Sequence, residues 1–209
     1  MYVRTSRLQF PPDQLDKAIA HFKEVTVPAA RQVAGFAGTV MLVNRSSGDC
    51  VANTFWESRD TLKASEDAGS RLRTQAAGAA GGNVTSVERY EIVIREMAAP
   101  PISGTYIRAN VGEAAPGKVD TLVERMRAEA LPTVQAQRGF RALNLGIDRD
   151  SGRFAIISVW DTPEDREASF AAIQEMRTRL FADIDAKNVE VAEYESVHVE
   201  FVAAPATAR

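Results

Sequence analysis

The sequence predicts an α+β protein made of two tandem ferredoxin-like (βαββαβ) repeats that pack sheet to sheet. Two observations predict this fold. One constant offset relates the halves: Phe55-Trp56-Glu57-Ser58 returns as Val159-Trp160-Asp161-Thr162, and 160 minus 56 is 104. The hydrophobic patterns in each half also follow the order strand, helix, strand, strand, helix, strand. Because internal repetition is a direct signature of a duplicated structural unit, the 209 residues divide into two similar units.

The offset holds through the chain without a gap. It relates Tyr2 to Tyr106, Arg4 to Arg108, Pro28 to Pro132, Gly35-Phe36 to Gly139-Phe140, Ser47-Gly48 to Ser151-Gly152, Arg73-Thr74 to Arg177-Thr178 and Tyr90-Glu91 to Tyr194-Glu195. We therefore predict a first repeat over residues 1–96, a linker over 97–104, a second repeat over 105–202 and a flexible tail over 203–209.

Composition excludes several classes of protein. Hydrophobic residues make up 45% of the chain and charged residues 25%, which is ordinary for a globular domain. The net charge of -3 lacks the basic excess that nucleic-acid binding requires. The longest apolar run, residues 35–43, is too short to cross a membrane, and no secretory signal is recognisable. The single cysteine, Cys50, aligns with Phe154, so we expect a small buried hydrophobe in a cytoplasmic protein.

The first half of each repeat is predicted to be a strand followed by a helix. Residues 2–8 and 105–111 are rich in β-forming residues, and Pro12 and Pro116 suit a first helical turn. Apolar residues then recur at helical spacing over 13–33 and in the matching stretch of the second repeat. Pro28 and Pro132 lie within or near the end of these helices and are expected to kink or break them.

The second half of each repeat is predicted to be a hairpin, a helix and a closing strand. Residues 39–44 and 50–56 flank a polar, glycine-containing turn, as do 143–147 and 154–160. Ser58 and Thr162 are candidate N-caps for helices over 59–76 and 163–184. Closing strands follow at 84–95 and 189–202. The glycine-rich residues 78–82 lack the Lys-Ser/Thr ending of a phosphate-binding loop.

A four-stranded sheet with helices on one face leaves its other face bare. Two such sheets in one chain can cover each other. The prediction is therefore an intramolecular dimeric α+β barrel, a pseudo-dimer that exists as a monomer or as a homodimer.

Three sequence features resemble a known family. The order of elements, the stretch from Phe55-Trp56 through Arg59-Asp60-Thr61-Leu62, and the closing Val87-Glu88-Arg89-Tyr90-Glu91 are similar to the antibiotic-biosynthesis-monooxygenase type of dimeric α+β barrel. The resemblance implies a pocket between sheet and helices. In some members this pocket oxygenates aromatic polyketides or quinols without metal or flavin, using an Asn, the Trp and sometimes an Arg.

The resemblance also assigns candidate residues. Trp56 and Trp160 match the family Trp, and Asn110 matches the family Asn. The position that carries a heme-ligating His in heme-degrading relatives holds Glu66 or Phe170, so heme degradation is not expected.

Strand alternation, without a bulge, predicts that the second repeat keeps a polar-lined pocket while the first has closed. Asn144, Ser196 and His198 stand where the first repeat has Val40, Ile92 and Ile94. The candidate catalytic residues are Trp160, Asn110, Arg108 and His198. The candidate substrate-binding residues are Tyr106, Asn144, Ser158, Tyr194, Ser196 and Trp56.

Structural roles compete with each of these assignments. The polar groups can satisfy one another, and both Trp rings can serve as core. Arg4 and Arg108 can pair with Glu91 or Glu195, because a buried guanidinium needs a partner.

The functional prediction is a small-molecule-binding protein, acting as a cofactor-independent monooxygenase on an aromatic polyketide-like or quinol-like compound. The alternative is a non-catalytic ligand-binding or oligomerisation module. The two histidines, His21 and His198, are far apart and have no ligand cluster nearby, so neither a metal nor another cofactor is expected. The expected partner is an aromatic small molecule.

Overall fold

The structure, a computed structural model, describes residues 1–202 and contains the predicted element order twice. The first repeat contains β1 (Tyr2–Gln9), η1 (Pro12–Gln14), α1 (Leu15–His21), η2 (Phe22–Thr26), α2 (Val27–Arg31), β2 (Phe36–Val43), β3 (Asp49–Trp56), α3 (Arg59–Ala64), α4 (Glu66–Ala79) and β4 (Asn83–Met97). The second contains β5 (Tyr106–Glu113), α5 (Val119–Arg125), η3 (Met126–Ala130), α6 (Leu131–Gln135), β6 (Phe140–Ile147), β7 (Arg153–Trp160), α7 (Pro163–Asp183) and β8 (Lys187–Phe201).

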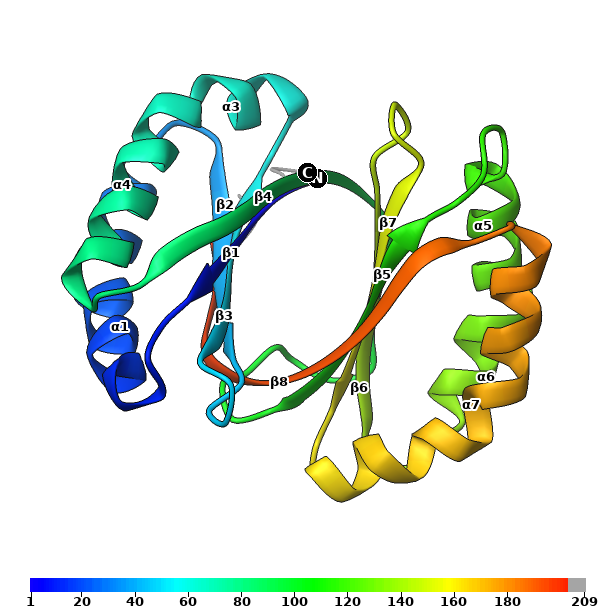
Figure 1. Cartoon of the computed structure of the whole chain (residues 1–209). Coiled ribbons are helices and arrows are strands. Elements are labelled where there is room, and N and C mark those ends of the chain that lie inside the picture. Colours follow the sequence, from blue (N-terminus) through cyan, green and yellow to red (C-terminus); the bar gives the residue numbers. More distant parts are fainter. Residues whose placement is uncertain (203–209) are drawn as a thin grey trace, which may run out of the picture. The chain divides into compact units, whose positions relative to one another are not determined.

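Hydrogen-bonded strands follow the order β1-β3-β2-β8-β5-β7-β6-β4 and form a closed barrel. This order confirms the predicted fold class, the dimeric α+β barrel. In each repeat the helices cover one face of the strands, with α1, α3 and α4 on the first set and α5, α6 and α7 on the second (Figure 1).

The two compact units of the chain do not coincide with the repeats. One unit holds residues 1–88 and the described residues from Val197 onward, and the other holds Arg89–Ser196. The last strand of each repeat, β4 or β8, is 15 residues long and is divided between the units. Repeat boundaries at 96 and 105 remain our proposal for the sequence organisation, and the predicted tail lies outside the described residues.

The first helix of each repeat contains a π-helical turn where the sequence predicts a kink or a break. The Val27 amide bonds to the Phe22 carbonyl, five residues back, and the next residue is Pro28. Since proline has no amide hydrogen, a wider turn just before it leaves the helix intact. The same arrangement recurs before Pro132, where the Leu131 amide bonds to the Met126 carbonyl.

Both predicted N-caps are confirmed. Ser58 accepts a hydrogen bond from the Thr61 amide in a capping box, and Thr162 accepts one from the Asp165 amide. The helix that starts at Ser58 is divided into α3 and α4, whereas α7 is continuous.

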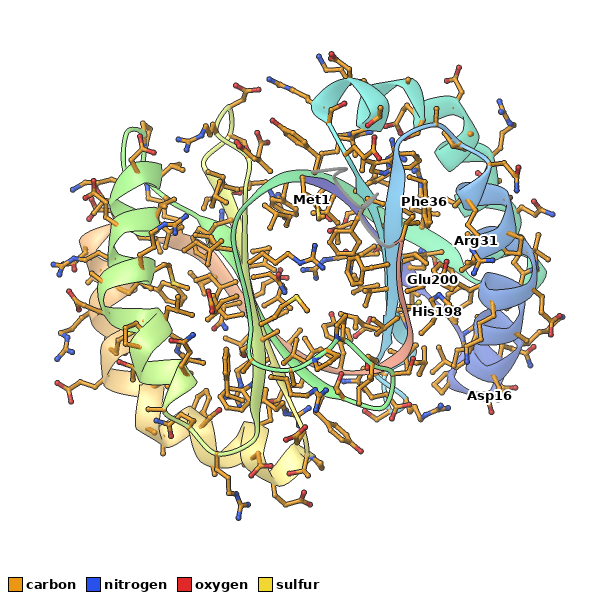
Figure 2. All side chains as sticks on the ribbon, turned by 180° about the vertical axis from the view of Figure 1, so that it is seen from behind. Met1, Asp16, Arg31, Phe36, His198 and Glu200 are labelled. Carbon is orange, nitrogen blue, oxygen red and sulfur yellow. The ribbon has the colours of Figure 1, made fainter. Side chains whose placement is uncertain are left out.

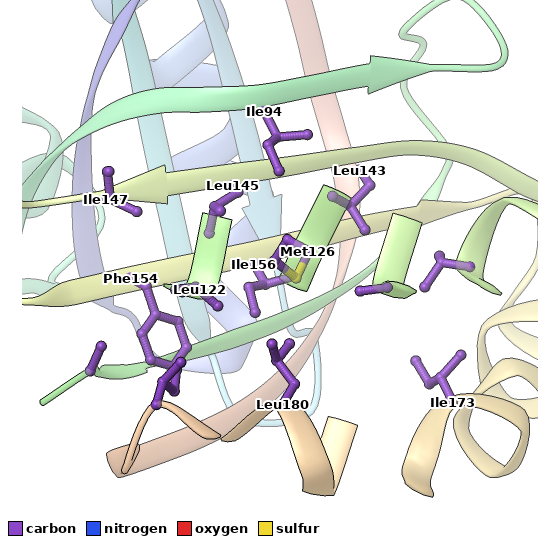
Figure 3. Close-up of a cluster of buried hydrophobic side chains, with 14 of the residues drawn as sticks. Ile94, Leu122, Met126, Leu143, Leu145, Ile147, Phe154, Ile156, Ile173 and Leu180 are labelled. Atoms are coloured by element: carbon purple, nitrogen blue, oxygen red, sulfur yellow. The ribbon is translucent and has the colours of Figure 1, made fainter. Parts of the chain in front are cut away.

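Each repeat has its own buried cluster between strands and helices. The cluster of the second repeat is built from large aliphatic and aromatic side chains, including Leu145, Phe154 and Leu180 (Figure 3). Within the part of the chain that the structure describes, no helix is long and apolar enough to cross a membrane.

Candidate functional site

A cavity lies inside the first repeat, between its strands and its helices. The space open to the centre of a water molecule is about 60 Å³. Its walls come from β1, β2 and β3 on one side and from α1, η2, α2 and α4 on the other, and they are mainly apolar. The prediction that the first repeat has closed into solid packing is therefore wrong.

The second repeat fills the corresponding space with larger side chains. At the constant offset of 104 residues, five small residues that line the cavity are replaced by large ones. The pairs are Ala18 and Leu122, Cys50 and Phe154, Ala52 and Ile156, Gly69 and Ile173, and Ala76 and Leu180. All five larger residues belong to the buried cluster of the second repeat (Figure 3). The difference in volume explains why the cavity lies in the first repeat.

One end of the cavity carries two arginines that share a carboxylate. Arg4 is 2% exposed, and its Nη2 donates to Leu62 O (2.7 Å), Ser65 Oγ (2.9 Å) and Glu66 Oε2 (3.1 Å). Arg73 Nη2 donates to Glu66 Oε1 at 2.9 Å. Glu66 therefore bridges the two guanidinium groups at this end of the cavity.

Trp56 forms the wall beside this charged end. The ring is buried, its Nε1 donates to Thr54 Oγ1 at 3.2 Å, and Arg4 Cζ lies 5.7 Å from the ring centroid. Phe36 packs edge-on against the ring at 6.1 Å. Packing alone accounts for the burial of Trp56, and its place in the cavity lining adds a surface for a flat ligand.

Trp160 is packed as core in the second repeat. It is fully buried, and its Nε1 donates to Ser158 Oγ at 3.0 Å. Beside it, Arg108 donates to Glu193 at 3.0 and 3.2 Å and to Ser169 Oγ at 3.1 Å. Trp160, Ser158 and Arg108 are therefore brought together, as predicted, but in a densely packed region.

Phe170 takes the place of Glu66 in the second repeat. Arg108 Cζ lies 4.9 Å from its ring centroid, and Arg177 Cζ lies 4.5 Å from it. An apolar ring thus separates the two guanidinium groups, whereas the first repeat joins the matching pair through a carboxylate.

The strand register shows which of the other predicted site residues lie on the same face of the sheet as Trp160. Tyr106 pairs with Trp160 across β5 and β7, and Asn110 pairs with Ile156, so both share its face of the sheet. A bulge between Phe140 and Ala142 places Leu143 opposite Ser158, so Asn144 points to the other face. The bulge is the physical reason why the predicted grouping of Asn144 with Trp160 is wrong.

The closing strand is also shifted by one residue from the predicted face. Arg108 pairs with Glu193 and Ile107 pairs with Tyr194, so Tyr194 and Ser196 lie on the face opposite Arg108. Ser196 Oγ lies 2.8 Å from Thr105 Oγ1. Glu193, rather than the expected Glu195, is the partner of Arg108, because the register of β8 sets Glu193 opposite Arg108 and Glu195 opposite Tyr106.

His198 belongs to the first unit, whereas the residues grouped around Trp160 belong to the second. Its ring packs edge-on against Phe22 at 5.6 Å, and Phe22 lines the cavity. Glu200 Oε2 lies 3.9 Å from His198 Nε2 and accepts a hydrogen bond from Arg31 (Figure 2). Burial lowers the pKa of His198; the charge of Glu200 opposes this shift, and those of Lys23 and Arg31 add to it.

Cys50 lines the cavity as a protonated thiol. It is 1% exposed, and burial, with the neighbouring charge of Asp49, raises its pKa to about 12. The prediction of a small buried hydrophobe is confirmed. Among the described residues, no group of three or more His, Cys, Asp or Glu side chains is placed to hold a metal ion.

Comparisons with known proteins agree with this fold. Residues 105–174 match the antibiotic biosynthesis monooxygenase family. The uncharacterised protein Rv2558 of Mycobacterium tuberculosis is 28% identical over 196 residues, which cover 93% of this chain and 83% of that protein. An anthrone oxidase-like protein of known structure has a TM-score of 0.71 at 17% identity, over 97% of this chain and 94% of its own.

A proposed monooxygenase from Fusobacterium nucleatum has a TM-score of 0.72 at 12% identity, over 96% of this chain and 94% of its own. At these identities the two structures establish the fold alone. The fold defines a dimeric α+β barrel. The second repeat matches the antibiotic biosynthesis monooxygenase family, and the whole chain resembles two tandem copies of that family's unit.

Proposed function

We propose that the first-repeat cavity binds a small aromatic molecule, and that the protein oxygenates a quinol-like or polyketide-like compound there without a cofactor. The observation that carries the proposal is the difference between the repeats. One copy keeps a cavity beside its family Trp, Trp56, while the other fills that volume with side chains. An unfilled cavity forfeits packing energy, so its retention in one copy supports a binding role.

In the proposed reaction the substrate supplies the electrons. A ring CH2 group beside an ionised phenol or enol loses its two hydrogens, gains one oxygen atom of O2 and becomes a carbonyl. The other oxygen atom leaves with those hydrogens as water. Positive charge from Arg4 and Arg73 favours the ionised form of the substrate, and Trp56 offers a flat surface to its ring.

Cavity volume limits how much of the ligand is enclosed. One water needs roughly 10–15 Å³ on the same measure, so about 60 Å³ encloses little more than a single small ring or a few waters. Thr26, Val33, Leu72 and Ala76 line the cavity from η2, α2 and α4, and all are half-buried. A polycyclic ligand would therefore extend outward between these helices.

A second candidate function is ligand carriage without catalysis. Among the described residues that line the cavity, none is a histidine or a carboxylate, and the Cys50 thiol is protonated at neutral pH. These residues offer hydrogen-bond donors and cations but no evident general base. We also propose that the protein is cytoplasmic, since a reduced Cys50 suits that compartment.

A thermal-shift screen with quinols, anthrones and naphthols tests the proposal. A ligand at 100 times its Kd adds about 2.7 kcal/mol to the stability of the folded state. The Ala76→Leu variant introduces the side chain of the second repeat and should fold normally but lose the shift. Oxygen consumption in the presence of the shifting compound separates a monooxygenase from a carrier. A shift that survives Ala76→Leu would place binding elsewhere.

A further inference from the structure

At the charged end of the cavity, a glycine lies beside the guanidinium groups of Arg4 and Arg73, and the proposed function does not require it. Gly69 is the fourth residue of α4 and lies between the two guanidinium groups. A Cβ at this position would lie 2.7 Å from Arg4 Nη1 and 3.0 Å from Arg73 Nη1. Glycine within a helix costs about 1 kcal/mol relative to alanine, and here it leaves the space that both Nη1 atoms approach.

The two nitrogen atoms differ from those that bind Glu66. The ion pairs to Glu66 use Arg4 Nη2 and Arg73 Nη2. Arg73 Nη1 is buried and has no hydrogen-bond partner among the described residues. A buried guanidinium donor without an acceptor is costly, because the lost hydration is not replaced. An anionic oxygen in the cavity would supply the acceptor.

We propose that Arg4 Nη1 and Arg73 Nη1, facing each other at Gly69, form a subsite for one anionic oxygen group, and that the ligand is a monoanionic aromatic acid. The inference rests on the proposed function, since it specifies the ligand of the same cavity. Glu66 already bridges the two guanidinium groups, so the ligand needs only one anionic group to supply the acceptor that Arg73 Nη1 lacks. Arginine suits this task because its planar fork matches a carboxylate or an enolate.

Thr26 supplies a second contact point. Thr26 lines the same cavity from the π-turn, and its hydroxyl is buried and has no hydrogen-bond partner among the described residues. The second repeat has Ala130 at this position. The ligand therefore carries a second polar group, such as a ring hydroxyl, that bonds to Thr26 Oγ1.

Benzoate and its neutral isostere benzamide test the anion subsite in the full chain by calorimetry. Benzoate should bind at least about tenfold more tightly, since a hydrogen bond to a charged group contributes that much. Arg73→Gln should abolish the preference. Gly69→Ala, whose methyl group displaces the flexible guanidinium ends, should abolish it too. The matched control Arg177→Gln, in the second repeat, should retain it.

Each outcome has a distinct meaning. Equal affinities for benzoate and benzamide would overturn the anion subsite and leave the cavity as a neutral binding site. No binding of either compound would overturn the subsite, whereas the thermal-shift screen with quinols, anthrones and naphthols decides the proposed function separately. A hydroxybenzoate that binds more tightly than benzoate, and loses this advantage in Thr26→Ala, supports the second contact. If no hydroxybenzoate has such an advantage, the assignment to Thr26 falls.

Discussion

The two family tryptophans have the same local contacts but different surroundings. Each indole donates to a hydroxyl two residues earlier on its strand, Thr54 for Trp56 and Ser158 for Trp160. Each ring also has a phenylalanine packed edge-on against it. Only Trp56 lines the described cavity. Their retention in both repeats therefore reflects packing, and a role in binding belongs to the first copy.

Replacing each Trp by Phe should separate these roles. Trp160→Phe should lower the free energy of unfolding by about 1–3 kcal/mol, through the lost hydrogen bond and the void left in the core. It should leave ligand affinity unchanged. Trp56→Phe should weaken both stability and binding. Urea unfolding and calorimetry measure the two effects, and a loss of binding in Trp160→Phe alone would move the site to the second repeat.

His198 should make the stability of the chain depend on pH. Burial lowers its folded-state pKa below the ordinary value of 6.5. Below about pH 6.5 the unfolded chain therefore binds a proton that the folded chain resists, so stability is full above this pH and falls as the pH drops toward the folded-state pKa. Glu200, whose pKa is lowered by Arg31, loses its contribution only below the ordinary value of 4.5.

The measurement is the free energy of unfolding between pH 5 and 7.5 for the natural chain and for His198→Gln. The variant should show a shallower fall over this range. Identical slopes in the chain and in His198→Gln would assign the pH dependence to other groups.

Among the helices and strands, α4 and α7 differ in the size of their inward-facing side chains, and this difference determines which repeat contains the cavity. The inner face of α4 carries Gly69 and Ala76, and that of α7 carries Ile173 and Leu180 at the matching positions. α7 begins at the Thr162 cap directly after β7, whereas the Ser58-capped helix α3 lies between β3 and α4. Side-chain volume at these matching positions therefore distinguishes the hollow repeat from the filled one.

Truncating α7 at one of these positions should show the cost of such a void. Leu180→Ala should lower the free energy of unfolding by about 2–5 kcal/mol, the usual range for a buried Leu→Ala change. Ala76→Leu, the reverse exchange in α4, should leave stability unchanged or raise it, because it fills existing space. Denaturant unfolding of both variants checks this. A large loss of stability in Ala76→Leu would mean that the cavity cannot accept the volume.

At the scale of the whole molecule, strands β4 and β8 each begin in the unit of their own repeat and end in the other unit. Residues 197–201 of β8 belong to the first unit, where Val202 N donates to Ala37 O and Arg31 pairs with Glu200. The first unit is therefore incomplete without the end of the second repeat.

A chain that ends at Ser196 should reveal this dependence. It keeps every residue that lines the cavity, yet it should lose the sheet edge along β2, unfold at a lower temperature and bind ligand weakly. A chain that ends at Val202 retains all described residues and is the control. Thermal unfolding and calorimetry compare the two chains. Equal unfolding temperatures would show that residues 197–202 add little to the first unit.

The sequence by itself determined the duplicated βαββαβ fold, the two N-caps and the hairpins. These features depend on local patterns: hydrophobic period, turn residues, capping side chains and the constant offset of 104. Side-chain size in the sequence also indicates which repeat holds the cavity. Cys50 and Gly69 in the first repeat correspond to the larger Phe154 and Ile173 in the second, although the polar residues of the second repeat led us to predict the pocket there.

Tertiary structure alone decided which residues meet. A one-residue bulge in β6 turned Asn144 away from Trp160, and the register of β8 placed Glu193 rather than Glu195 beside Arg108. No local pattern marks either shift, because side chains alternate with a period of two and one inserted residue reverses every face after it. Arg73, missed from the sequence, joins Arg4 only because a helix crosses the sheet where Gly69 leaves room.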